Sequence, residues 1–211
     1  MKTTYRIFDL GLTGLDKGLA FQKEIFQRVK DDEFKAALIF CRHHPVITLG
    51  RSARKENILV DSAELEQRRI SICRIERGGD VTYHGPGQLM VYPVFNLAYF
   101  KKDIHFFLRK LEGTAIKALE AFGIKGERIE GKTGVWAGPD KIASIGIAVK
   151  QWVSFHGLAI NVKKDDLGNF TLIKPCGMDI MMTSMETILG KNVEIDAVKE
   201  VIVREDLIWP K

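Results

Sequence analysis

One cysteine stands in a sequence setting that suits a reactive thiol. Cys176 lies in the tripeptide Pro-Cys-Gly, where the proline fixes φ and the glycine leaves the sulfur approachable. The other two cysteines, Cys41 and Cys73, lie in apolar runs and are expected to be small buried side chains. Because the thiolate is the nucleophilic form, Cys176 needs a cation or a base beside it near neutral pH.

Histidine is the usual helper of such a thiol, and the chain has five. His84 and His156 are the better candidates, since both lie in segments that also contain glycine. The others are expected in a polar turn (His43 and His44) or on the wet face of a helix (His105). A pairing of Cys176 with His84 or His156 would also suit a hydrolase.

Lysine is the alternative helper. Lys141 begins the stretch KIASIGIAV, whose other residues are nearly all apolar or small. If its side chain points inward, desolvation lowers its pKa and makes it a usable base. Lys174 lies two residues before Cys176 and is a further candidate. Composition does not choose between the histidines and the lysines.

A glycine-rich stretch, RGGDVTYHGPGQ at 77–88, indicates a second functional segment. It matches neither GxGxxG nor GxxxxGK[ST], so it is not a dinucleotide or Walker phosphate loop. The glycine pair after Arg77 would expose backbone N–H groups to a carbonyl, carboxylate or phosphate. The alternative is a long hairpin that binds nothing. Gly146 and Gly157, each inside a strand pattern, also suggest that something lies against the sheet.

The elements that must position these residues alternate between helices and strands. We expect a single domain over 1–211, of the α/β or α+β class, with a mixed sheet flanked by helices. Pro93 suggests an edge or a bend in its strand. The predicted helices are 15–30, Asp103 to Gly123, a short one with a Thr183/Glu186 capping box, and one within 196–206; the predicted strands are 36–41, 45–51, 68–76, 88–97 and a meander over 132–162.

Composition narrows the class of protein. Of 211 residues, 45% are hydrophobic and 28% charged, as in an ordinary globular protein. No apolar run is long enough for a signal-peptide core or a membrane span, so a cytoplasmic protein is expected. The net charge of +5 suits an acidic protein partner or a nucleic acid. The chain lacks arginine-rich arms and cysteine/histidine clusters, so neither nucleic acid nor a metal is expected.

Four motifs carry a family resemblance. RGGDVTYHGPGQ, GPDKIASIG, FHGLAINV and PCGM occur in this order, and together they resemble the lipoyl(octanoyl) transferases, or octanoyl-[acyl-carrier-protein]–protein N-octanoyltransferases. The resemblance covers roughly residues 5–190. It implies a fold similar to that of the biotin and lipoate protein ligases, with a mixed sheet flanked by helices.

The resemblance also implies roles for individual residues. Cys176 would be the acyl-thioester nucleophile, and Lys141 would lower its thiol pKa and act as general acid and base. The acyl substrate would lie against three segments, formed by Arg77, Gly78, Gly79, Asp80, Val81, Thr82, Tyr83 and His84, by Ser144, Ile145 and Gly146, and by Gly157, Leu158 and Ala159.

The implied reaction is the first step of endogenous protein lipoylation. An octanoyl group would pass from octanoyl-acyl carrier protein, where phosphopantetheine carries it, to a lysine of a lipoyl domain. The implied acceptors are the E2 subunits of 2-oxoacid dehydrogenases and the H protein of the glycine cleavage system, and no further cofactor is implied.

Three other functions remain open from the residues. A lipoate or biotin ligase would activate a free acid with ATP and would not need a nucleophilic cysteine. A Cys/His hydrolase would release the free acid. A non-catalytic module would bind acyl carrier protein and would not depend on Cys176.

Overall fold

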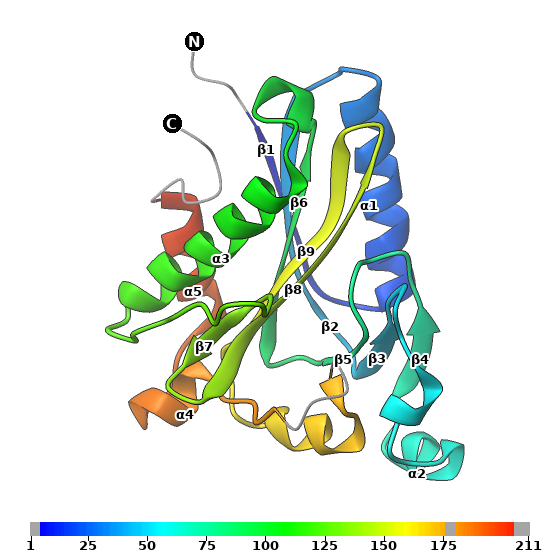
Figure 1. The fold of residues 1–211 in the computed structure, drawn as a ribbon, viewed down its shortest axis with the longest axis vertical. Helices are drawn as coiled ribbons and strands as arrows, with labels where there is room; N and C mark the ends of the chain where they lie inside the picture. Colours follow the sequence, from blue (N-terminus) through cyan, green and yellow to red (C-terminus); the bar gives the residue numbers. More distant parts are fainter. Residues whose placement is uncertain (1–4, 176–179, 205–211) are drawn as a thin grey trace.

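The structure, a computed structural model, describes residues 5–175 and 180–204. At its centre is a six-stranded sheet with the order β1-β2-β6-β9-β8-β7 (Figure 1). The first two strands pair in parallel and the other pairs are antiparallel, so the sheet is mixed as predicted. The strands are β1 (Arg6–Thr13), β2 (Ala36–His43), β6 (Gln88–Phe95), β7 (Val135–Ala137), β8 (Asp140–Lys150) and β9 (Val153–Asn161).

A second, three-stranded sheet lies beside the large one, in the order β4-β3-β5. It has its own small core, which includes Ile47, Tyr83 and Phe170. Its strands are β3 (Val46–Leu49), β4 (Ser71–Arg74) and β5 (Val81–His84), and the short helices near it are η1 (Lys55–Asn57), α2 (Ser62–Gln67) and η3 (Leu167–Leu172).

Helices cover both faces of the large sheet (Figure 1). Helix α1 (Leu15–Lys30) packs on one face, and α3 (Ile104–Glu120) and α5 (Ile195–Arg204) pack on the other. Strand β2 shows why: Leu38 and Phe40 belong to the core under α3 and α5, whereas the alternate residue Ile39 belongs to the core under α1. Because successive side chains of a strand point to opposite faces, a strand with both faces covered is apolar throughout.

Helix ends follow the capping rules, with one shift. The Asp103 side chain accepts a hydrogen bond from the Phe106 backbone N–H and starts α3 as predicted. The short helix α4 (Met185–Leu189) is capped by Ser184, whose hydroxyl accepts from the Thr187 N–H. The predicted cap at Thr183 is therefore wrong by one residue. None of the helices in the described ranges is both long and apolar enough to span a membrane.

The structure corrects two expectations about single residues. His43, expected in a polar turn, ends β2 and is fully buried. Cys73, expected to be buried, is half-buried on β4, which is an edge strand of the small sheet. Cys41 is buried, as predicted.

Of the two settings predicted for Pro93, an edge or a bend, the edge is wrong, since β6 lies between β2 and β9. Its pairing with β9 ends at Val91, two residues before the proline, so the missing N–H falls beyond that ladder.

Gly157 accounts for the close approach of β9 to β6. A Cβ at this position would lie 2.2 Å from the Val91 carbonyl oxygen and 2.7 Å from Pro93 Cδ. The position that a side chain would occupy is filled by the backbone of the neighbouring strand. This contact with β6 by itself requires a glycine at position 157.

We predict that Gly157→Ala destabilises the fold, because the methyl group must push β6 and β9 apart. Overpacking of this kind raises the free energy of the native state by about 1–3 kcal/mol, which lowers Tm by several degrees in a chain of this size. Thermal unfolding followed by circular dichroism measures it. Gly168→Ala is the control, since its Cβ would meet nothing within 4 Å; equal Tm values for the two variants would contradict the packing argument.

Candidate active site

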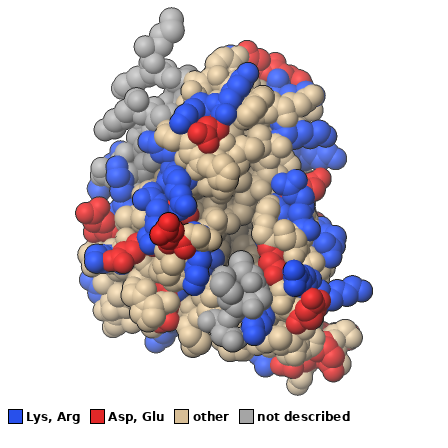
Figure 2. Space-filling view, viewed as in Figure 1, with Lys and Arg blue, Asp and Glu red and all other residues tan. Residues whose placement is uncertain are grey.

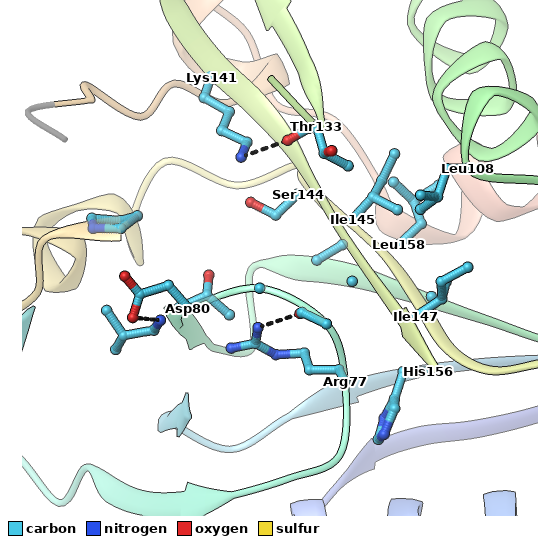
Figure 3. A pocket seen from close by; sticks show the side chains of 18 of the residues that line it. Arg77, Asp80, Leu108, Thr133, Lys141, Ser144, Ile145, Ile147, His156 and Leu158 are labelled. Carbon is cyan, nitrogen blue, oxygen red and sulfur yellow. Dashed lines mark hydrogen bonds between the residues drawn. The ribbon is translucent and has the colours of Figure 1, made fainter. Parts of the chain in front are cut away.

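A large cavity opens between the two sheets, with a volume of about 730 Å³. Strands β8 and β9 form one wall, and the loop that precedes β5 forms the other (Figure 3). Leu108 of α3 and Ile145 and Leu158 of the large sheet give one side of it an apolar surface.

Nearly all the residues predicted to bind the substrate line this cavity. Tyr83 is the exception: it is buried in the core of the small sheet, its ring packs on Phe170, and its hydroxyl contacts Asp166 and Asn169. These contacts turn the Tyr83 side chain away from the cavity that its neighbours Thr82 and His84 line. The predicted residues on the cavity wall are Arg77, Gly78, Gly79, Asp80, Val81, Thr82, His84, Lys141, Ser144, Ile145, Gly146, Gly157, Leu158 and Ala159.

The glycine-rich stretch is not one long loop. Residues 77–80 form the glycine loop. Strand β5 follows it, and a second turn at 85–87 leads into β6. Asp166, which the sequence analysis missed, holds that second turn by accepting a hydrogen bond from the Gly87 N–H.

The glycine loop is fastened to both sheets. The Gly78 N–H donates to the Ile147 carbonyl of β8 at 2.8 Å, and the Ser52 N–H, in the turn that follows β3, donates to the Gly79 carbonyl at 3.1 Å. A Cβ at Gly146 would lie 3.0 Å from the Gly78 carbonyl oxygen, so Gly146 is small to admit this loop. The loop thus closes the cavity over β8, and its own backbone explains the glycine in the strand.

Arg77 is a buried cation that holds the base of the loop, with 7% of its surface exposed. Its guanidinium donates to the Thr48 carbonyl at 2.7 Å, to the Thr48 hydroxyl at 2.9 Å and to the Gly78 carbonyl at 3.1 Å. These charge-assisted hydrogen bonds join the loop to β3 and fix the positive charge at the cavity wall.

Lys141 points inward, the orientation that the sequence left open. Only 6% of the residue is exposed, its Nζ donates to the Thr133 carbonyl at 3.0 Å, and it lies 5.1 Å from the centre of the Trp136 ring. A Cβ at Gly134 would meet Lys141 Cε at 2.5 Å, so this glycine leaves the path for the lysine side chain. Figure 3 shows the side chain reaching toward Ser144 within the cavity.

Glu112 on α3 supports the segment that receives Lys141, and the sequence analysis missed it. Its carboxylate is 1% exposed and pairs with Arg109 at 2.7 Å and Arg128 at 2.9 Å. It also accepts from the Gly134 N–H at 3.3 Å. The sequence feature that could have revealed Glu112 is a glutamate within the apolar face of a helix. Such a group is rarely buried unless it is paired, so its position indicates a buried ion pair.

Cys176, the predicted nucleophile, lies outside the described residues. Pro175 and Ile180, the described residues nearest to it on either side, both line the cavity that Lys141 lines. The backbone of Lys141 donates to the Met181 carbonyl and accepts from the Thr183 N–H, each at 2.9 Å. Strand β8 therefore anchors the chain shortly after the Pro-Cys-Gly motif. Lys174, the alternative helper, does not line this cavity but a smaller pocket that adjoins it at Gly79 and Asp80.

The buried histidines near the cavity are held neutral. Burial and the nearby Arg77 charge lower the pKa of His84 to about 3 and that of His156 to about 4. Burial also lowers the pKa of His43, whose Nε2 contacts the Tyr92 hydroxyl at 2.8 Å. Neutral imidazoles can bind polar groups by hydrogen bonds, but they supply no cation to a thiolate.

A chain of hydrogen bonds connects His84 to the segment after Cys176. His84 Nδ1 contacts Gln88 Oε1 at 3.0 Å, Gln88 Nε2 donates to Asn161 Oδ1 at 2.8 Å, and Asn161 Nδ2 donates to the Thr183 carbonyl at 2.9 Å. Gln88 and Asn161 were not predicted. Their signal is polarity within otherwise apolar strands, because a buried amide must be satisfied by a partner.

The site offers acid–base and electrostatic chemistry. A buried lysine lies at one end of a partly apolar cavity, and a fixed arginine and the residues of the glycine loop line it. Among residues 5–175 and 180–204, no group of three or more His, Cys, Asp or Glu side chains is placed to hold a metal ion. On the molecular surface, Lys and Arg side chains gather on both sides of the hollow in this face (Figure 2).

The fold is that of lipoate and biotin protein ligases. A bipartite lipoate protein ligase from Thermoplasma acidophilum matches with a TM-score of 0.77 at 20% identity, over 96% of this chain and 82% of that one. The biotin protein ligase from Aquifex aeolicus, solved with biotin and ATP, matches with a TM-score of 0.56 at 13% identity, over 96% of this chain and 70% of that one. The predicted fold class is confirmed.

Sequence comparison identifies the family to which the chain belongs. Residues 16–205 match the model of the lipoyl protein ligase A/B catalytic domain. The octanoyltransferase of Thermoanaerobacter sp. strain X514 is 47% identical over 199 residues, which cover 93% of this chain and 86% of that protein. The chain therefore belongs to the lipoyl protein ligase A/B catalytic family, and within it to the octanoyltransferases. It is an acyltransferase, as the motifs predict.

The neutral histidines predict a stability that falls in acid. An unfolded histidine takes up a proton below its ordinary pKa of about 6.5, whereas native His84 and His156 stay neutral down to about 3 and 4. Between these limits each histidine lowers the free energy of unfolding by up to about 1.4 kcal/mol per pH unit as the pH falls.

Denaturant unfolding at a series of pH values between 7 and 4.5 measures this slope. His84→Gln should make it shallower than in the unmodified protein, because one differentially titrating group is gone. The exposed residue His105 provides the control variant His105→Gln, which should keep the original slope. Identical slopes in all three proteins would show that His84 takes up its proton over the same pH range in the native and unfolded states, which would contradict the lowered pKa.

Proposed function

We propose that the protein transfers an octanoyl group from octanoyl-acyl carrier protein to a lysine of a lipoyl domain, through a thioester on Cys176. The observation that carries the proposal is the buried Lys141 ammonium in the cavity that Pro175 and Ile180 also line. The octanoyltransferase relatives support the reaction class, and the lipoate ligase fold supports a lipoyl domain as acceptor.

In the first half-reaction the Cys176 thiolate attacks the carbonyl carbon of the octanoyl thioester. The tetrahedral intermediate collapses, the bond to the phosphopantetheine sulfur breaks, and Lys141 gives that sulfur its proton. The enzyme then holds the acyl group on Cys176. Lys141 acts first as the cation that favours the thiolate and then as a general acid.

In the second half-reaction the amine of the acceptor lysine attacks the acyl-enzyme carbonyl. Lys141, now neutral, accepts a proton from that amine, and the Cys176 thiolate leaves as the amide forms. The thioester is already activated, so no ATP and no cofactor are required. Backbone N–H groups near the intermediate would stabilise its oxyanion, at about 3–4 kcal/mol for one donor.

The acyl chain is proposed to lie along Ser144–Gly146 and Leu158, beneath the glycine loop. Seven carbons, at about 0.8 kcal/mol for each buried methylene, supply roughly 5–6 kcal/mol of binding. That is enough to choose octanoyl over acetyl. Tyr83 has no part in this binding, because it faces the core of the small sheet.

The partners are proposed to be acidic at their docking faces. Arg51 and Lys132 line the cavity and would attract such faces at long range. The proposed acceptors are the lipoyl domains of E2 subunits and the glycine cleavage H protein. Residues 1–211 are proposed to act as one catalytic domain. The proposed location is the cytoplasm.

Intact-mass spectrometry tests the covalent step. The purified protein mixed with octanoyl-acyl carrier protein should gain one octanoyl group, and Cys176→Ala should gain none. Adding a lipoyl domain should return the enzyme to its original mass as the domain becomes octanoylated. Octanoylation of the lipoyl domain from free octanoate and ATP without carrier protein would instead indicate a ligase, and release of free octanoate as the main product a hydrolase.

The pH dependence of thiol alkylation tests the role of Lys141. Lys141→Ala should raise the pKa of the Cys176 thiol, because the neighbouring cation is lost, and should lower kcat/KM for transfer by about 10²–10⁴. Lys174→Ala is the matched control and should leave the alkylation profile in place. An unchanged profile in Lys141→Ala would exclude it as the partner of the thiol.

A further inference from the structure

A second cavity of about 920 Å³ lies behind the first, between α1 and the β8–β9 hairpin. Leu19 and Phe26 of α1 and Phe155 of β9 give it an apolar part. Charged residues also line it, namely Lys23, Arg51, Arg74, Glu76 and Lys150. Three residues, Arg51, Ile75 and His156, line both cavities. His156 is thus a shared wall at the end of the acyl cavity that lies away from Lys141, as Figure 3 shows.

Strand geometry relates this wall to the length of an acyl chain. His156 pairs with Ile147, which lies three residues beyond Ser144 on β8, or about 10 Å along the strand. An extended chain advances about 3.3–3.6 Å for every three bonds, so the seven carbon–carbon bonds of an octanoyl group cover about 8 Å. A chain whose carbonyl lies beside Ser144 therefore ends just before His156.

The wall contains buried polar atoms. His156 and Gln22 are 4% and 2% exposed, and His156 Nε2 and Gln22 Nε2 have no hydrogen-bond partner among the described residues. Both nitrogens lie inside the wall, so the wall acts on an acyl chain through the volume of the buried ring rather than through an exposed polar atom. Burial keeps the imidazole neutral, with its pKa lowered to about 4, so the wall is polar without being charged.

The backbone of His156 is held in an uncommon conformation. Its φ is 58°, in the left-handed region that non-glycine residues seldom occupy. Gln22 Oε1 accepts a hydrogen bond from the His156 N–H at 2.9 Å. The amide of α1 thus fixes the position of the ring between the two cavities, and packing of His156 on Phe155, with ring centres 4.9 Å apart, adds to this.

We propose that His156, held by Gln22, is the end wall that limits the acyl chain to about eight carbons, and that the cavity behind it receives longer chains when the wall is removed. The inference rests on the proposed function. It assigns chain-length specificity to a residue that lies outside the predicted substrate-binding segments.

Competition between two donors tests the proposal. The protein is given equal amounts of octanoyl- and dodecanoyl-acyl carrier protein with a lipoyl domain, and the ratio of kcat/KM values is read from the products. In the unmodified protein octanoyl should be favoured. His156→Gly should raise the dodecanoyl-to-octanoyl ratio at least about tenfold, since each extra methylene that finds an apolar site is worth about fourfold.

The choice of glycine removes the ring without adding backbone strain, because glycine adopts positive φ freely. His156→Asn also tolerates this conformation and keeps a shorter polar group, so it should shift the ratio in the same direction but less. Gln27→Leu is the matched control: Gln27 lines the second cavity but bonds to Asp31 on its own helix, and the variant should keep the original ratio.

Direct binding separates this proposal from the proposed function. Dodecanoate should raise the Tm of His156→Gly more than octanoate does, and the order should be reversed in the unmodified protein. An unchanged donor ratio in folded His156→Gly and His156→Asn would overturn the proposal, as would equal use of the two donors by the unmodified protein. If the unmodified protein transfers no octanoyl group at all, the proposed function itself fails.

Discussion

The contact between the glycine loop and β8 is the constraint on which the site depends. The Gly78 N–H bonds to the Ile147 carbonyl, and Gly146 has no side chain where that loop crosses the strand. The contact joins a small sheet that has its own core to the large sheet, and the cavity is the space left between them. Glycines at these positions therefore allow the loop and the strand to pack against each other. The loop can approach the strand this closely because no side chain separates the two.

The ionisable groups around the cavity differ in charge: Arg77 is positive, and the two histidines are neutral. Hydrogen bonds to Thr48 and Gly78 hold the Arg77 guanidinium in place. Burial, together with the Arg77 charge, lowers the pKa values of His84 and His156 and keeps both neutral. Neither histidine is therefore suited to be the cation beside a thiolate at neutral pH, although the sequence made both reasonable candidates for that role. Lys141 is left as the buried amine that lines the cavity, which supports the lysine alternative over the histidine one.

Much of the fold could be predicted from the sequence because periodicity and caps are local signals. Helices α1 and α3 begin where Leu15 and Asp103 place them, and the meander that forms β7 to β9 follows from alternating residues around short turns. The mixed sheet and the ligase fold agree with the resemblance that four motifs carry.

What could not be predicted depends on contacts between distant segments. No local pattern shows that Tyr83 points to the small core, that the space beside Gly157 is filled by β6, or that His43 is buried. The direction of the Lys141 side chain was open for the same reason. It is set by Thr133 and Gly134, which reach it from a neighbouring segment.

The buried carboxylate of Glu112 has a consequence for how this enzyme class can diverge. Glu112 never touches the cavity, yet it tethers Gly134 and, through that segment, the oxygen that receives the Lys141 ammonium. Its two arginine partners are partly open to solvent, at 54% and 41% for the side chains of Arg109 and Arg128. The alignment of the proposed base is thus set from an outer surface, where substitutions can accumulate without blocking the path of the substrate.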